Sequence, residues 1–90
     1  MADVTVTHIG GTTFQVEVRE GAIRTIHHVT ATQTDVQQYG GGRSAERLIK
    51  ASFEFLLERE PKESIMSAFA LPVIERYFPE YPDEIRKRLA

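Results

Sequence analysis

The stretch Phe53-Glu54-Phe55-Leu56-Leu57-Glu58-Arg59-Glu60-Pro61 decides the fold of this 90-residue chain. It is the end of an apolar helix, because a proline disfavours helical backbone at the preceding residue and so stops the helix by residue 60. Upstream of it, apolar side chains recur at helical spacing from residue 45, and Ser44 suits the N-cap. The sequence therefore predicts one long helix over residues 44–60.

The first third of the chain has a different period. Apolar and polar residues alternate in residues 4–7 and 14–19, and residues 23–31 are rich in β-branched side chains. Glycines interrupt these runs, which is typical of antiparallel strands joined by tight hairpins. The expected fold class is therefore α+β, with a three-stranded antiparallel meander over residues 3–31. The helices of residues 44–90 are expected to pack on one face of that sheet, because three strands with one apolar face are not stable alone.

The hairpins also predict a register. A two-residue turn at residues 20–21 places Glu17 opposite Arg24, a pair of opposite charges that supports a hairpin. A three-residue loop in the first hairpin places Val6 opposite Phe14. Ile26 then falls on the outer face. The inner, apolar face expected from this register comprises Val4, Val6, Phe14, Val16, Val18, Ile23 and Val29.

The rest of the chain predicts shorter helices around the long one. Residues 32–39 are polar and favour no more than a single helical turn. Proline at the start and basic residues at the end are typical signals of short helices, and Ser64 suits an N-cap. We expect these helices at residues 64–69, 73–78 and 83–89. No linker or internal repeat separates them, so residues 1–90 are expected to form a single domain.

Composition excludes several classes of function. The chain has no cysteine, which rules out disulfides, thiolate catalysis and cysteine-ligated metals. Its formal net charge of −2 gives no general attraction to nucleic acid. No apolar run approaches the roughly 18 residues of a membrane span, and the N-terminus lacks a signal-peptide pattern. We therefore expect a cytoplasmic protein without a membrane partner.

The central helix and the segment after it carry a resemblance. The string Leu-Ile-x-x-Ser-Phe-Glu-Phe-Leu-Leu-Glu-Arg-Glu-Pro begins at Leu48, and Arg-Tyr-Phe-Pro-Glu-Tyr begins at Arg76. These segments resemble a family of small bacterial proteins with no assigned activity. The resemblance implies a bacterial source and a shared fold, and it brings no catalytic residue with it.

The three histidines do not predict a metal site. His27 and His28 are neighbours on a strand and point to opposite faces. His8 and His27 share a face but lie on the two outer strands, two spacings of about 4.8 Å apart. That separation is too wide for two ligands at about 2.1 Å from one ion. The sequence thus predicts neither a metal nor any other cofactor, with His27 at the core edge and His28 in solvent.

The turn before the long helix is a candidate anion site, comprising Gly41, Gly42, Arg43 and Ser44. Backbone amides at a helix N-terminus, with an arginine beside them, favour a phosphate or carboxylate. The turn lacks the lysine and the glycine spacing of a nucleotide-binding P-loop. A hinge between sheet and helix is the alternative interpretation.

A candidate interaction surface comprises Arg59, Arg76, Tyr77 and Tyr81, residue types that are enriched at protein interfaces. Two structural alternatives stand beside it. Arg59 could anchor the helix end by binding its free carbonyls or a later helix. The aromatic and proline residues around Tyr77 could instead form a small satellite core on the long helix.

No acid, base and nucleophile set converges in the sequence, so we expect a non-catalytic protein. The leading interpretation is a small protein-interaction module whose partner is another protein or a second copy of the chain. One alternative is a regulator that contacts nucleic acid through the basic residues 86–88 or the loop at Arg43, although the net charge gives no general attraction to this partner. The other is a ligand sensor that uses the turn at residues 40–44.

Overall fold

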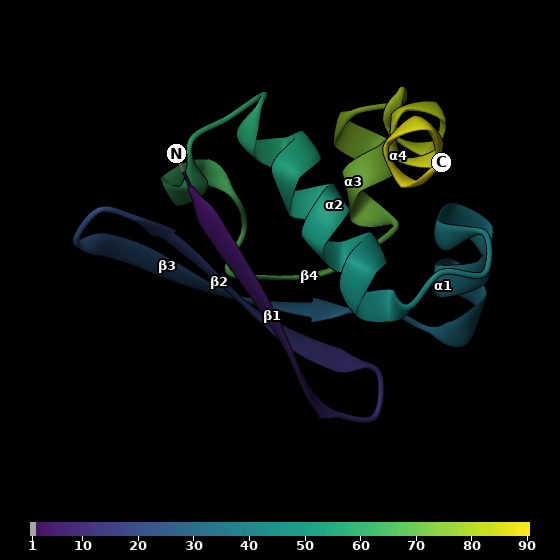
Figure 1. Ribbon diagram of the computed structural model, residues 1–90, viewed down its shortest axis with the longest axis horizontal. Helices are drawn as coiled ribbons and strands as arrows, with labels where there is room; N and C mark the ends of the chain where they lie inside the picture. The colour runs from purple at the N-terminus through teal and green to yellow at the C-terminus, as the bar shows by residue number, and fades with distance from the viewer. Residues whose placement is uncertain (1) are drawn as a thin grey trace.

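A computed structural model describes residues 2–90 and shows a sheet covered on one face by helices (Figure 1). The strands are β1 (Asp3–Gly10), β2 (Thr13–Glu20), β3 (Ile23–Thr30) and β4 (Ala68–Ala70). The helices are α1 (Gln33–Gly40), α2 (Ala45–Leu57), the 3-10 helix η1 (Lys62–Ser64), α3 (Val73–Tyr77) and α4 (Tyr81–Leu89). The α+β class and the antiparallel meander β1-β2-β3 are therefore confirmed.

The sheet has a fourth strand that was not predicted. β4 pairs parallel with β3, with Val29 opposite Phe69, so the sheet is mixed and runs β1-β2-β3-β4. The expectation of a helix over residues 64–69 is wrong. The physical reason lies in the outer edge of β3, whose backbone groups border a buried region and need hydrogen-bond partners. The N–H of His28 donates to the carbonyl of Ser67 at 2.8 Å, and that of Leu71 donates to the carbonyl of Thr30 at 2.9 Å.

The predicted register is displaced by two residues in both hairpins. Val6 pairs with Val16 instead of Phe14, and Glu17 pairs with Ile26 instead of Arg24. The second turn lies one residue later than expected, at residues 21–22, where Gly21 has φ +60°. In the first hairpin an irregularity at Ile9 precedes the turn. A shift of two keeps every side chain on its predicted face, because strand side chains repeat every second residue.

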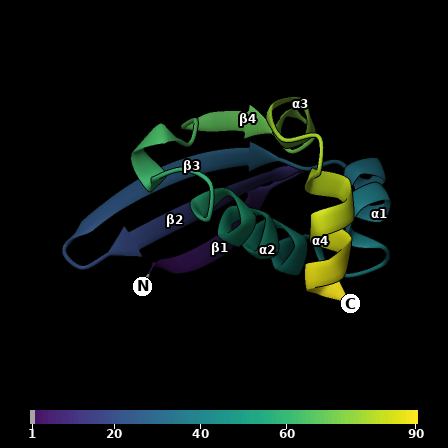
Figure 2. The ribbon, with the colours of Figure 1, turned by 90° about the horizontal axis from the view of Figure 1, so that it is seen from above.

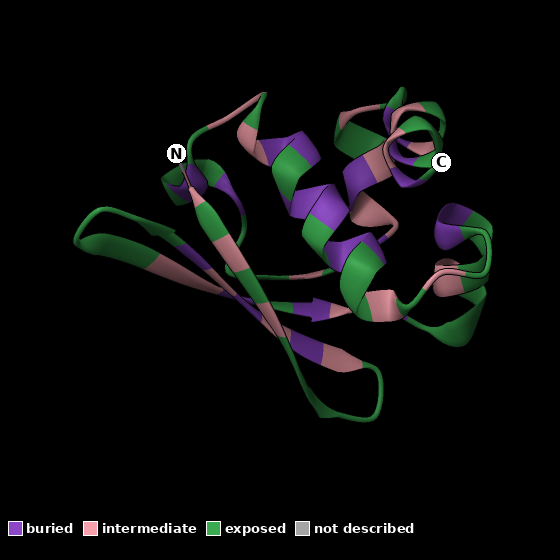
Figure 3. Ribbon diagram, in the orientation of Figure 1, coloured by how far each residue is buried: buried purple, intermediate pink, exposed green. Residues whose placement is uncertain are grey.

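The inner face packs against α2, which crosses the sheet (Figures 1 and 2). On α2 the buried side chains form one stripe, and the exposed ones lie on the opposite side (Figure 3). Most of the predicted inner-face valines are buried or half-buried, but Ile23 lies at the hairpin tip, where its exposed fraction is 62%. The core is formed by buried side chains from the sheet and the helices, among them Val16, Val18, Val29, Leu48, Ile49, Phe53, Phe55, Leu71, Ile74, Tyr81 and Ile85.

Helix boundaries follow local signals. Ser44 caps α2 as predicted, its side chain accepting from the N–H of Arg47 at 3.2 Å. α2 ends at Leu57, earlier than residue 60, and the N–H groups of Arg59 and Glu60 both donate to the carbonyl of Leu56. α1 is a full helix rather than a single turn, because Thr32 and Asp35 form a capping box. α4 packs against α2 and α1.

Candidate functional site

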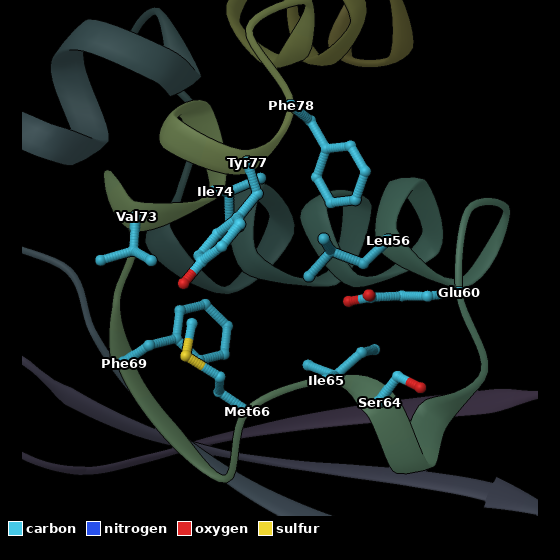
Figure 4. Close-up of a pocket in the computed structure, with 10 residues that line it drawn as sticks. All are labelled: Leu56, Glu60, Ser64, Ile65, Met66, Phe69, Val73, Ile74, Tyr77 and Phe78. Carbon is cyan, nitrogen blue, oxygen red and sulfur yellow. The ribbon is translucent and has the colours of Figure 1, made fainter.

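An apolar groove opens between the carboxyl end of α2, the segment from η1 to β4, and α3 (Figure 4). Its volume is about 450 Å³, within the range of small-ligand and side-chain binding clefts. We call this feature the apolar groove. It is lined by Leu56, Glu60, Ser64, Ile65, Met66, Phe69, Val73, Ile74, Tyr77 and Phe78.

Large apolar side chains are exposed to solvent at the mouth of the groove. Within residues 2–90 four such side chains are exposed, and two of them, Met66 at 41% and Tyr77 at 67%, line the groove. The other two, Ile9 and Ile23, lie at the tips of the two hairpins. Exposed apolar side chains that cluster around a cavity are characteristic of binding sites, whereas isolated ones are normal.

A buried lysine, Lys62, fixes the position of the segment from η1 to β4, which forms one wall of the groove. Lys62 begins η1, and its Nζ lies 2.9 Å from a carboxylate oxygen of Glu20 on β2 and 2.9 Å from one of Glu63. The hydrogen bonds that Lys62 donates to the carboxylates of Glu63 and Glu20 raise its pKa, so its charge is retained. The ion pair between Lys62 and Glu20 therefore holds η1, where the chain enters the groove wall, against the turn of the second hairpin.

His27 fixes the next part of the same wall. Its Nδ1 lies 2.8 Å from the carbonyl of Met66, and its Nε2 lies 2.8 Å from Oγ1 of Thr25. A carbonyl only accepts, so Nδ1 carries the proton and donates to Met66. The ring is buried and packs on Phe53 at 5.3 Å between centroids, whereas His28 is exposed, as the sequence predicts. His27 therefore has a structural role: its hydrogen bond fixes the backbone of Met66 at the mouth of the groove.

The free edge of β4 borders the groove. The carbonyl of Ser67 and the N–H of Leu71 bond to β3, and main-chain groups alternate in direction along a strand. The N–H and carbonyl groups of Ala68 and Ala70 therefore point away from β3. Both residues are exposed, and β4 is the last strand of the sheet (Figure 2). This edge offers backbone hydrogen bonds to an added strand.

Glu60 is the charged residue among the groove lining of residues 2–90. Its half-buried side chain extends between Leu56 and Ile65, and its carboxylate is turned toward the cavity (Figure 4). The two cations nearest in sequence are engaged elsewhere, since Arg59 pairs with Glu80 at 3.2 Å and Lys62 with Glu20. A carboxylate thus marks one end of an otherwise apolar surface.

The predicted interaction surface divides in the structure. Tyr77 lines the groove, and Arg76 is exposed beside it. Tyr81 is fully buried and belongs to the core, so it forms no part of a surface. Arg59 has the predicted anchoring geometry: it donates to the carbonyl of Phe55 at 3.1 Å and stacks 3.7 Å above the ring of the same residue.

The turn at residues 41–44 is engaged in helix capping. Gly41 adopts φ +57° and ends α1, its N–H donating to the carbonyl of Gln37 at 3.1 Å. The side chain of Arg43 folds back over Gly41, and Ser44 caps α2. The candidate anion-binding residues therefore lie together, but the hydroxyl of Ser44 is already used within the chain.

The basic end of α4 is partly neutralised. Arg88 is hydrogen-bonded to Glu58, which lowers the pKa of that carboxyl, and Arg86 lies 3.5 Å from Asp83. Both pairs reduce the positive charge that a phosphate backbone would meet. The structure therefore lends no support to the predicted alternative of nucleic-acid contact at residues 86–88.

Two buried tyrosines connect the helices. The hydroxyl of Tyr39 donates to Glu75 at 2.7 Å, and burial together with that carboxylate raises the pKa of Tyr39 to about 12. Ser52 donates to the carbonyl of Leu48, so the hydroxyl of Tyr81 donates to Ser52 at 2.7 Å. Burial raises the pKa of Tyr81. Both hydroxyls therefore stay neutral near pH 7 and act structurally.

Sequence reasoning missed most of the groove. The sequence predicts a helix where Ile65, Met66 and Phe69 line the groove, and it does not point to Glu60 as a site residue. One signal was available: Pro61 ends α2, and Pro72 follows so soon that little room is left for another helix between them. That pattern favours an irregular or extended segment after the helix.

Comparisons with models of protein families, with curated proteins and with solved structures find no match to this chain. The resemblance expected from the segments beginning at Leu48 and Arg76 therefore stays a prediction. Among residues 2–90, none of the helices combines the length and apolar character needed to cross a bilayer.

Proposed function

We propose that this chain is a small, non-catalytic protein-interaction module that binds an extended segment of a partner protein along the apolar groove. The observation that carries the proposal is the groove's position beside the open edge of β4. A partner strand added to that edge would donate to and accept from Ala68 and Ala70. Alternate side chains of the added strand would point toward the helix layer and enter the groove.

The composition of the lining supports binding rather than catalysis. Leu56, Phe69 and Ile74 provide apolar walls, and the lining includes no pair of acid and base. Met66 and Tyr77 gain buried area when a partner covers them, which favours association. The absence of cysteine fits a reducing compartment such as the cytoplasm as the place of this activity.

A peptide titration followed by ¹⁵N NMR tests the proposal. The probe is a blocked, neutral pentapeptide with leucine at alternate positions, so that one face enters the groove. We expect chemical-shift changes at the amides of Met66, Ala68 and Ala70. Changes confined to other surfaces, or none at millimolar peptide, would contradict the proposal.

Matched double variants distinguish binding in the groove from nonspecific binding to exposed apolar side chains. The test variant combines Met66→Gln with Tyr77→Ser, and the control combines Ile9→Gln with Ile23→Ser. Each removes two exposed apolar side chains without changing charge. We expect the groove variant to weaken peptide binding about tenfold, because burying such side chains contributes on the order of 1–2 kcal/mol. The hairpin variant should bind as the natural chain does, and equal weakening in both would refute the groove.

The module is also proposed to form homodimers through β1. This strand is the other edge of the sheet and spans eight residues. It contains neither lysine nor proline, the residues that commonly protect an edge from pairing. Ile26 lies on the outer face but is only half-exposed, so the open edge of β1 is a stronger reason for self-association than an apolar outer face.

A further inference from the structure

We infer that the partner segment carries a lysine or arginine beside its apolar anchor, and that Glu60 selects it. This inference rests on the proposed function, since it assumes that a protein segment occupies the groove. The starting point is a single carboxylate inside an apolar cleft.

The local environment leaves the Glu60 carboxylate available. Within residues 2–90 it forms no ion pair, and its backbone N–H is fixed to the carbonyl of Leu56 at 2.9 Å. Arg59, the adjacent residue, stacks on Phe55 and pairs with Glu80 and Glu58. Lys62 is held by Glu20 and Glu63. No internal cation therefore competes with one supplied by a partner.

When a partner segment covers the groove, the charge of that segment strongly affects its binding affinity. An apolar segment laid over Leu56 and Ile65 would strip water from the carboxylate that lies between them (Figure 4). A carboxylate that loses water without gaining a partner is costly, and a second carboxylate nearby is repelled. A lysine or arginine restores the lost interactions through a charge-assisted hydrogen bond. The groove also adjoins the carboxyl end of α2, whose dipole favours a cation.

Three blocked peptides test this selection. They share one leucine-containing core and differ only in whether the last side chain is lysine, glutamine or glutamate. By NMR titration of the full chain at low salt, we expect the lysine peptide to bind about three- to tenfold more tightly than the glutamine peptide. The glutamate peptide should bind most weakly, and the lysine preference should shrink as salt rises.

Two variants assign the preference to a residue. Glu60→Gln should remove the discrimination between lysine and glutamine peptides while leaving the affinity for the glutamine peptide within about twofold. The control is Glu46→Gln, an exposed carboxylate in the first turn of α2, which removes the same charge away from the groove. It should keep the lysine preference.

The outcomes distinguish this inference from the proposed function. Equal affinity for the lysine and glutamine peptides, with shifts still at the groove, overturns the selection by Glu60 and leaves the groove as a neutral binding site. A preference that survives Glu60→Gln also overturns it. If none of the three peptides causes chemical-shift changes at the groove, both proposals are overturned.

Discussion

Arg59 shows how much a single residue can reveal before its environment is known. Its position just before a proline predicted a role at the helix end, and the structure places its guanidinium on Phe55 with a hydrogen bond to the carbonyl of the same residue. Glu60, one position later, stands at the same helix end, but the sequence does not show that its side chain lines a groove. Its importance depends on Ile65, which the chain brings alongside only by turning back at Pro61.

Tyr39 predicts a stability loss at high pH. The pKa of its hydroxyl is about 12 in the folded chain against 10.0 ordinarily, so the folded state holds the proton more tightly. The resulting stabilisation is complete below pH 10 and is lost as pH rises from 10 to 12. We expect this hydroxyl to account for up to roughly 2 kcal/mol of the stability that the natural chain loses over this window, measured by urea unfolding at pH 8, 10 and 11.5.

The variant Tyr39→Phe provides the check on that assignment. It should cost about 1 kcal/mol at pH 8, because Glu75 loses its hydrogen-bond donor. It should also show a smaller loss of stability from pH 10 to 11.5 than the natural chain. An identical alkaline loss in both proteins would place the titration at another group.

At the scale of elements, alternation and glycine punctuation predicted the meander but not its register. The two-residue shift has a simple cause. Several turns are possible at Gly10-Gly11 and Gly21, and registers that differ by two residues keep every side chain on the same face. The predicted Glu17–Arg24 ion pair still forms at 3.2 Å, although the two residues are diagonal neighbours rather than opposite each other. Charge pairing therefore did not determine the register.

β4 could not be predicted from its own three residues. Ala68-Phe69-Ala70 is too short for a period, and alanine favours helix. The strand exists because β3 offers unpaired backbone groups at a covered edge, which is a tertiary effect. The groove depends on this strand, so most of the candidate site was equally hidden from the sequence.

The capping box of α1 gives a test at this scale. Thr32→Ala removes the acceptor for the N–H of Asp35, 3.1 Å away, and should lower the free energy of unfolding by about 1 kcal/mol. Thr32→Ser keeps the hydroxyl and should cost a few tenths at most. Urea unfolding at pH 7 measures both, and equal stability of the alanine and serine variants would show that the cap contributes little.

For the whole molecule, the main asymmetry is between its two sheet faces. One is covered by α2, and the other carries an ion-paired cluster of Glu17, Arg19 and Arg24. The binding surfaces proposed here are therefore edges rather than faces: β4 for a partner segment and β1 for a second copy.

Dimer formation through β1 is tested by light scattering across micromolar to millimolar concentration. We expect an apparent mass that rises toward twice 10.2 kDa. Thr7→Lys should hold the chain monomeric, because a lysine on an edge strand discourages strand pairing. Gln15→Lys is the control, since Gln15 lies opposite Thr7 on the central strand. A mass of one chain at all concentrations, or equal effects of both lysines, would count against this dimer.

The parallel pairing of Val29 with Phe69 spans forty positions of the chain. During synthesis the meander emerges from the ribosome first, and one edge of β3 stays unpaired until the residues of β4 have been synthesised. Contacts so distant in sequence close slowly, because the intervening loop must lose its freedom beforehand. The nascent chain therefore exposes an unpaired strand edge for a time, and the apolar groove is completed only near the end of folding.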